Sequence, residues 1–101
     1  MSVLLELSIF PLGAGESVGE AVSLAVRAIR ATGHPCQLTA MGSLIETPTL
    51  SEALEALEAA HGALARAGFD RVYATAKIDA RSGPLGRLEG KVASVEARLS
   101  G

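Results

Sequence analysis

The chain has 101 residues, close to the commonest size of a single domain and enough to bury one hydrophobic core. Hydrophobic residues make up 49% of the sequence but aromatic residues only 3%, so Leu, Val, Ile and Ala must form that core. A formal charge of −2 and scattered Lys and Arg provide no basic surface for a phosphate backbone. We therefore expect one globular domain over residues 1–101 that does not bind nucleic acid.

Two features bear on location. The single cysteine, Cys36, cannot form a disulfide within the chain, which is compatible with a reducing compartment. The N-terminus has no basic segment with a cleavage site, and no apolar run reaches the roughly 18 residues of a membrane span. The expectation is a soluble cytoplasmic protein with no membrane partner.

The first third of the chain predicts a strand and then a helix. Val, Leu and Ile recur at every second position over residues 3–10, and Pro11 ends this strand. After a glycine-containing loop, Ser17-x-x-Glu20 has the pattern of a capping box, and Gly33 ends the helix. Its apolar stripe comprises Val18, Val22, Ala25, Val26 and Ile29.

The rest of the chain predicts a hairpin, a helix, a strand and a last helix. Strands at 36–39 and 43–47 surround residues 40–42, where glycine allows the tight connection. Thr49-x-x-Glu52 caps a second helix, residues 71–79 form a strand, and a narrow amphipathic helix covers 85–99. The two apolar stripes comprise Leu50, Leu54, Leu57, His61 and Leu64, and then Leu85, Leu88, Val92, Val95 and Leu99.

The element order is therefore β-α-β-β-α-β followed by α. Both halves leave their helix through similar segments, "ATGHPCQL" and "RAGFDRVY". This order predicts an α+β, ferredoxin-like sandwich, in which two helices cover one face of an antiparallel sheet and a C-terminal helix is added.

Alternation along the strands predicts which residues lie on the helix-free face. That face mixes polar and apolar side chains, as a small-molecule pocket does. A face buried in an oligomer and a merely solvated face remain as alternatives. The candidate ligand-binding residues are Glu6, Ser8, Phe10, Gln37, Thr39, Met41, Ser43, Tyr73, Thr75 and Lys77. The face that Ser43 occupies is not assigned, because the alternation across the turn can shift by one residue.

No pattern in the sequence indicates catalysis. Gly13-x-Gly15-x-x-x-Gly19 follows a strand, but the large parallel sheet of a dinucleotide-binding fold is missing. His34-x-Cys36 supplies too few ligands for a metal. No nucleophile elbow or Ser/His/Asp set is present. We expect no catalytic residues, no metal, no cofactor and no enzymatic activity.

Four segments together resemble a known family: "LLELSIFPLGAGESVGEAV", "QLTAMGSLIE", "VYATAKIDAR" and "KVASVEARL". In order and spacing they are similar to the small thiamine-binding proteins of the MTH1187/YkoF-like superfamily. The resemblance implies a ferredoxin-like domain that assembles through its sheet into dimers and then tetramers, and that binds thiamine or its hydroxymethylpyrimidine moiety. The chain departs from the family pattern at Ala40, Ser43 and Thr47-Pro48.

Three hypotheses follow. The first is a homo-oligomeric, non-enzymatic binder of thiamine, in which Glu6 pairs with the aminopyrimidine while Met41, Phe10 or Tyr73 contacts the ring. The second is a ferredoxin-like regulatory or protein-interaction module with no small-molecule ligand. The third, least favoured, is an enzyme built as a dimeric α+β barrel.

Overall fold

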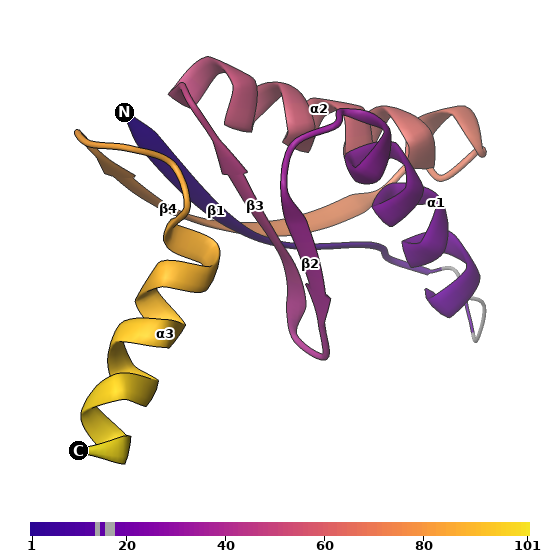
Figure 1. The fold of residues 1–101 in the computed structure, drawn as a ribbon. Coiled ribbons are helices and arrows are strands. Elements are labelled where there is room, and N and C mark those ends of the chain that lie inside the picture. The colour runs from indigo at the N-terminus through magenta and orange to yellow at the C-terminus, as the bar shows by residue number, and fades with distance from the viewer. Residues whose placement is uncertain (14, 16–17) are drawn as a thin grey trace.

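The computed structural model describes residues 1–13, 15 and 18–101, which fold in the order β-α-β-β-α-β-α (Figure 1). The predicted α+β, ferredoxin-like arrangement is confirmed. The elements are β1 (Ser2–Pro11), α1 (Val18–Ala31), β2 (Cys36–Thr39), β3 (Gly42–Thr47), α2 (Leu50–Arg66), β4 (Val72–Arg81) and α3 (Arg87–Ser100).

The four strands form one antiparallel sheet in the order β2-β3-β1-β4. β1 is central and pairs with β4 from Ser2, opposite Arg81, to Pro11, opposite Val72. Its alternate residues Val3, Leu5 and Leu7 are buried against the helices. The intervening residues of β1 therefore lie on the other face, as the period of two predicts.

The two covering helices pack mainly through small residues. α1 buries Ala21, Ala25 and Ile29, and α2 buries Ala53, Ala56, Ala60 and Leu64. The predicted stripe of α2 is thus rotated, since Leu50 and Leu54 remain 44% and 48% exposed. Alanine side chains allow helices and sheet to approach closely, so the alanine side of α2 faces the core together with Leu64, while Leu50 and Leu54 lie at its margin.

The predicted cap of α2 is present at Thr49. Its backbone is extended, with φ −135° and ψ 156°, and its side-chain oxygen accepts a hydrogen bond of 3.1 Å from the Glu52 backbone N–H. The corresponding cap predicted for α1, at Ser17, lies outside the described residues, as does part of the glycine-containing loop before it.

The hairpin between β2 and β3 turns at Ala40 and Met41. The Thr39 hydroxyl donates a hydrogen bond of 2.8 Å to the Gly42 carbonyl and accepts one of 3.2 Å from the Met41 backbone N–H. Gly42 has a φ of +150°, and a Cβ there would stand 2.7 Å from the Leu7 carbonyl oxygen. Glycine is therefore required by the neighbouring strand as well as by the turn.

β4 and α3 are the least buried elements. β4 is an edge strand whose residues are exposed from Tyr73 onward. Figure 1 shows α3 extending away from the sheet, and among the described residues none in α3 is buried. Within the described part of the chain, no helix is long and apolar enough to cross a membrane.

Candidate functional site

Most of the predicted ligand-binding residues share the helix-free face. The pairing places Glu6 opposite Lys77, Ser8 opposite Thr75 and Phe10 opposite Tyr73. On the far side of β3, Gln37 lies opposite Leu44 and Thr39 opposite Gly42. Residues directly opposite in an antiparallel pair point to the same face, so these strands form one continuous surface, which we call the open face.

Two predicted residues lie elsewhere. Ser43 pairs with Leu7 on the helix-covered side and is only 6% exposed. Met41 is at the hairpin tip and 81% exposed. The sequence left open by one residue which face Ser43 occupies. The observed pairing places Ser43 on the helix-covered face and not on the open face.

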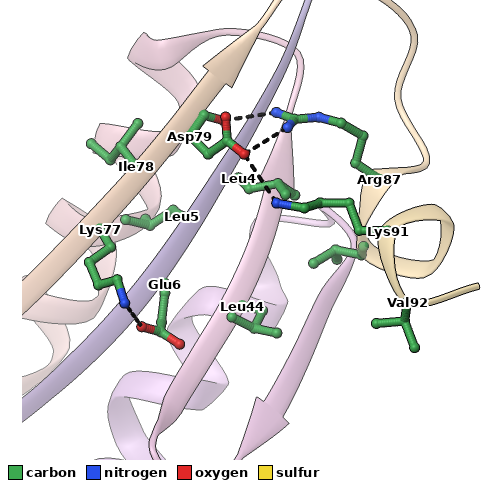
Figure 2. Close-up of a pocket in the computed structure, with 11 residues that line it drawn as sticks. Leu4, Leu5, Glu6, Leu44, Lys77, Ile78, Asp79, Arg87, Lys91 and Val92 are labelled. Atoms are coloured by element: carbon green, nitrogen blue, oxygen red, sulfur yellow. Dashed lines mark hydrogen bonds and ion pairs between the residues drawn. The ribbon is translucent and has the colours of Figure 1, made fainter. Parts of the chain in front are cut away.

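The open face and α3 enclose a cavity of about 380 Å³ (Figure 2). Its sheet side is formed by β1, β3 and β4, and its other wall by the first turns of α3. The lining is largely apolar with charged groups at the margin: Leu4, Leu5, Glu6, Leu44, Lys77, Ile78, Asp79, Arg87, Leu88, Lys91 and Val92. This volume lies within the usual range for small-molecule sites.

Glu6 and Lys77 form one charged pair beside this cavity. The Lys77 Nζ lies 3.5 Å from the Glu6 Oε1, across the β1–β4 pair (Figure 2). The side chains are 42% exposed for Glu6 and 77% for Lys77. Such an exposed pair is weak, so the Glu6 carboxylate can exchange Lys77 for a cationic or amino-bearing ligand at small cost.

Asp79 forms a second charged group with two cations of α3. Its Oδ2 lies 2.9 Å from the Arg87 Nη1 and 3.3 Å from the Lys91 Nζ (Figure 2). The hydrogen bonds from Lys91 and then Arg87 hold the pKa of Asp79 below its usual value. Asp79 is therefore ionised at neutral pH, and its negative charge is paired with the positive charges of Arg87 and Lys91 on α3.

A second cavity, of about 190 Å³, lies at the hairpin end of the sheet beneath α1. It is lined in part by the predicted residues Ser8, Phe10, Thr39, Met41 and Ser43. The Phe10 ring packs on Tyr73 with a centroid distance of 5.7 Å and an interplanar angle of 38°. The Thr39 hydroxyl is already hydrogen-bonded within the turn, and the aromatic pair provides apolar surface at this end.

Glu46 is a buried charged residue that the sequence analysis did not select. It pairs with Leu4 on the open-face side and is only 2% exposed. Its carboxylate accepts a 2.5 Å hydrogen bond from the Ser2 hydroxyl and four from three backbone N–H groups, those of Gly86, Arg87 and Leu88. Side chains alternate along β3, so once Leu44 is known to pair with Glu6, Glu46 is expected on the same open-face side.

The α3 side of the cavity was also missed. Its Leu88 and Val92 belong to the predicted apolar stripe, but the sequence does not show which surface that stripe meets. Among the described residues, no group of three or more His, Cys, Asp and Glu side chains is arranged to hold a metal. The recognisable chemistry of the open face is therefore that of an apolar cavity with paired charges at its rim.

Comparisons with known proteins agree with this architecture. The sequence model of a family described as thiamine-binding protein matches residues 5–96. A UPF0045 protein of Mycobacterium bovis is 43% identical over 99 residues, covering 98% of this chain and 96% of that protein. A UPF0045 protein of Methanothermobacter thermautotrophicus is 39% identical over 98 residues, covering 96% and 99%.

Solved structures share the fold. A hypothetical protein from Methanocaldococcus jannaschii has a TM-score of 0.82 at 33% identity, over 94% of this chain and 96% of that one. A putative thiamine biosynthesis/salvage protein from Thermotoga maritima has a TM-score of 0.80 at 17% identity, over 94% and 99%. At that identity the second likeness concerns the fold alone.

Proposed function

The chain belongs to the thiamine-binding protein family, and from that membership we propose that it binds thiamine, or its hydroxymethylpyrimidine moiety, without catalysing a reaction. The observation that carries the proposal is the cavity between the open face and α3, which combines apolar walls with the Glu6 carboxylate. A flat ring with an amino group, which thiamine and hydroxymethylpyrimidine share, matches both features, and the positive charge of thiamine adds to the match.

Glu6 is the proposed recognition group. Thiamine carries a permanent positive charge and an exocyclic amine, and a carboxylate can accept a charge-assisted hydrogen bond from that amine. Leu4 and Leu44 on the sheet and Leu88 on α3 would contact the ring. Lys77, whose Nζ lies 3.5 Å from Glu6, would turn away toward solvent when the ligand binds, because its side chain is largely exposed.

The remaining open-face residues form the proposed outer part of the site. Phe10 and Tyr73 offer aromatic surface toward the hairpin end, with Met41 beyond them at the hairpin tip. The flanking hydrogen-bonding groups are Ser8, Gln37, Thr39 and Thr75. Ser43 has no role in this proposal as an open-face residue, because it is buried on the opposite side.

The proposal includes self-association through the sheet, into a dimer or tetramer. β4 is a ten-residue strand at the sheet edge, and its exposed edge carries backbone groups that another strand can pair with. The apolar stripe of α3 is also uncovered, with Val92 and Val95 exposed by 60% and 55%. A second copy of the chain would cover both surfaces.

Calorimetric titration tests the ligand. The purified protein is unfolded and refolded to remove any bound molecule, then titrated with thiamine, thiamine phosphate and hydroxymethylpyrimidine. Saturable binding is expected, and the ranking of the three shows which moiety is recognised. An absence of heat with all three up to millimolar concentration would overturn the proposal and favour a ferredoxin-like protein-interaction module instead.

A further inference from the structure

The attachment of α3 to the sheet is almost entirely polar. Among the described residues, none in α3 is buried, and Leu88 is its one half-buried apolar side chain. The hydrogen bonds that join α3 to the strands come from its first two turns and the preceding Gly86. The position of this helix therefore depends on a small number of polar contacts.

Glu46 makes the central contact. Gly86, at the N-cap position just before α3, has no side chain and so cannot cap the helix itself. Both oxygens of the Glu46 carboxylate accept from the Gly86 N–H, at 3.1 and 3.0 Å, and one accepts from the Arg87 N–H at 3.1 Å. A residue 40 positions away in the chain thus caps α3, and its negative charge lies at the positive end of the helix dipole.

Ser2 and Arg87 extend this contact to the other strands. The Ser2 hydroxyl donates to Glu46 and accepts from the Arg87 Nε at 3.0 Å. The Arg87 Nη2 donates to the Ser2 carbonyl at 2.7 Å and to the Asp79 carbonyl at 2.8 Å. Glu46, Ser2, Arg87 and Asp79 therefore connect β3, β1, α3 and β4, which are the four elements around the main cavity.

We propose that Glu46 is a positioning residue for the ligand site: its carboxylate holds α3 against the sheet and thereby forms the helical wall of the cavity. Glu46 does not line this cavity, whereas Arg87, Leu88, Lys91 and Val92 of α3 do. Since the wall exists only when α3 is docked, docking of α3 and occupation of the cavity are thermodynamically linked, and each strengthens the other by the same factor. The identity of the ligand rests on the proposed function; the role of Glu46 in holding α3 does not.

Amide hydrogen exchange of α3, combined with thiamine titration, tests this link. Glu46→Gln keeps the side-chain shape but removes the charge. We expect it to lower the exchange protection of α3 by about tenfold while α2 stays protected, and to weaken thiamine binding by a similar factor. In the unchanged protein, saturating thiamine should raise the protection of α3 more than that of α2.

Two further variants keep the test decisive. Glu96→Gln removes an exposed carboxylate near the other end of α3, away from the cavity and from the positive end of the helix dipole, and should change neither quantity. Ser2→Ala removes one hydrogen bond of Glu46 and should lower α3 protection by about fivefold, which gives a reading even if Glu46→Gln does not fold.

Unchanged α3 protection in Glu46→Gln, or in Ser2→Ala if the former is unfolded, would overturn the proposal. So would lowered α3 protection with unchanged thiamine affinity, because the helix would then not form the wall. If the unchanged protein binds no thiamine, the proposed function fails, and the role of Glu46 is decided by exchange in the ligand-free proteins.

Discussion

Gly42 lies so close to Leu7 that a Cβ atom at position 42 would stand 2.7 Å from the Leu7 carbonyl oxygen. Real Cβ atoms do not approach backbone oxygens this closely, and the φ of +150° at Gly42 adds strain for any other residue. We expect Gly42→Ala to lower the free energy of unfolding by roughly 2–4 kcal/mol. Urea denaturation measures the change.

A matched control for this substitution is Gly19→Ala, in the first turn of α1. Among the described residues, no atom outside the neighbouring backbone of α1 lies within 4 Å of a Cβ at Gly19, so the free energy of unfolding should stay the same or rise by up to about 1 kcal/mol. Equal losses at Gly42 and Gly19 would contradict the role of the close approach to β1.

The same glycine shows what the sequence could and could not predict. Its place in a tight hairpin follows from local pattern, and so does the open-face position of Glu6, since both depend on near neighbours. The contact of Gly42 with Leu7 is set by the pairing of β3 with β1, about 35 residues apart in the chain, which no local pattern records. Ser43 was ambiguous for the same reason.

The helices show a related limit. Periodicity predicted the amphipathic face of α2 from its leucines, but close packing selected the alanine side, with Ala53 and Ala56 buried. For α3 the apolar stripe was visible, yet its attachment comes from Glu46, which caps the helix from β3. A cap supplied from 40 residues away has no sequence signature comparable to that of Thr49, which caps its own helix.

Opposite effects are expected at the two members of the Glu6–Lys77 pair. Glu6→Gln should weaken thiamine binding by more than about tenfold, because the amine loses a charged acceptor. Lys77→Met should strengthen it by about two- to threefold, because the carboxylate loses its competing partner. Calorimetric titration gives both affinities, and light scattering checks that assembly is unchanged.

The contrast between these variants is the control. A general disturbance of the open face would weaken binding in both, whereas competition at the carboxylate predicts opposite signs. Unaltered affinity in Glu6→Gln would remove Glu6 from the site. The pair itself contributes at most about 1 kcal/mol to stability, so neither variant should unfold the protein.

Acid should weaken the contribution of Glu46. Burial raises the pKa of Glu46, but hydrogen bonds from Ser2 and the N–H groups of Arg87, Leu88 and Gly86 outweigh burial and hold the pKa below its usual 4.5. A carboxyl group with a lowered pKa in the folded state stabilises the protein above its unfolded pKa, and loses this effect as pH falls through the folded pKa.

Glu46→Gln should therefore weaken the docking of α3 by about 1.4 kcal/mol at pH 7, which is the tenfold loss of exchange protection, and this difference from the unchanged protein should shrink progressively below pH 4.5. Protection factors of the α3 amides at pH 7, 5, 4 and 3, each corrected for the intrinsic exchange rate at that pH, measure it. Other groups around this contact, Asp79, Arg87, Glu89 and Lys91, are present in both proteins, so their titration largely cancels in the difference. A difference independent of pH would show that the effect of the substitution does not come from the charge of Glu46.

Self-association at β4 is testable with two matched hydrophobic residues. Ile78 on the edge strand and Leu50 on α2 are both 44% exposed, so replacing either with Lys removes a similar exposed apolar surface. A lysine on an edge strand opposes pairing with another strand, because the charge would be brought against the incoming copy. We expect Ile78→Lys to lower the mass measured by light scattering toward that of one chain, and Leu50→Lys to leave the assembly intact. If neither variant dissociates, the interface lies away from the β4 edge. If both dissociate, the loss is a general effect of the added lysine and does not support an interface at β4.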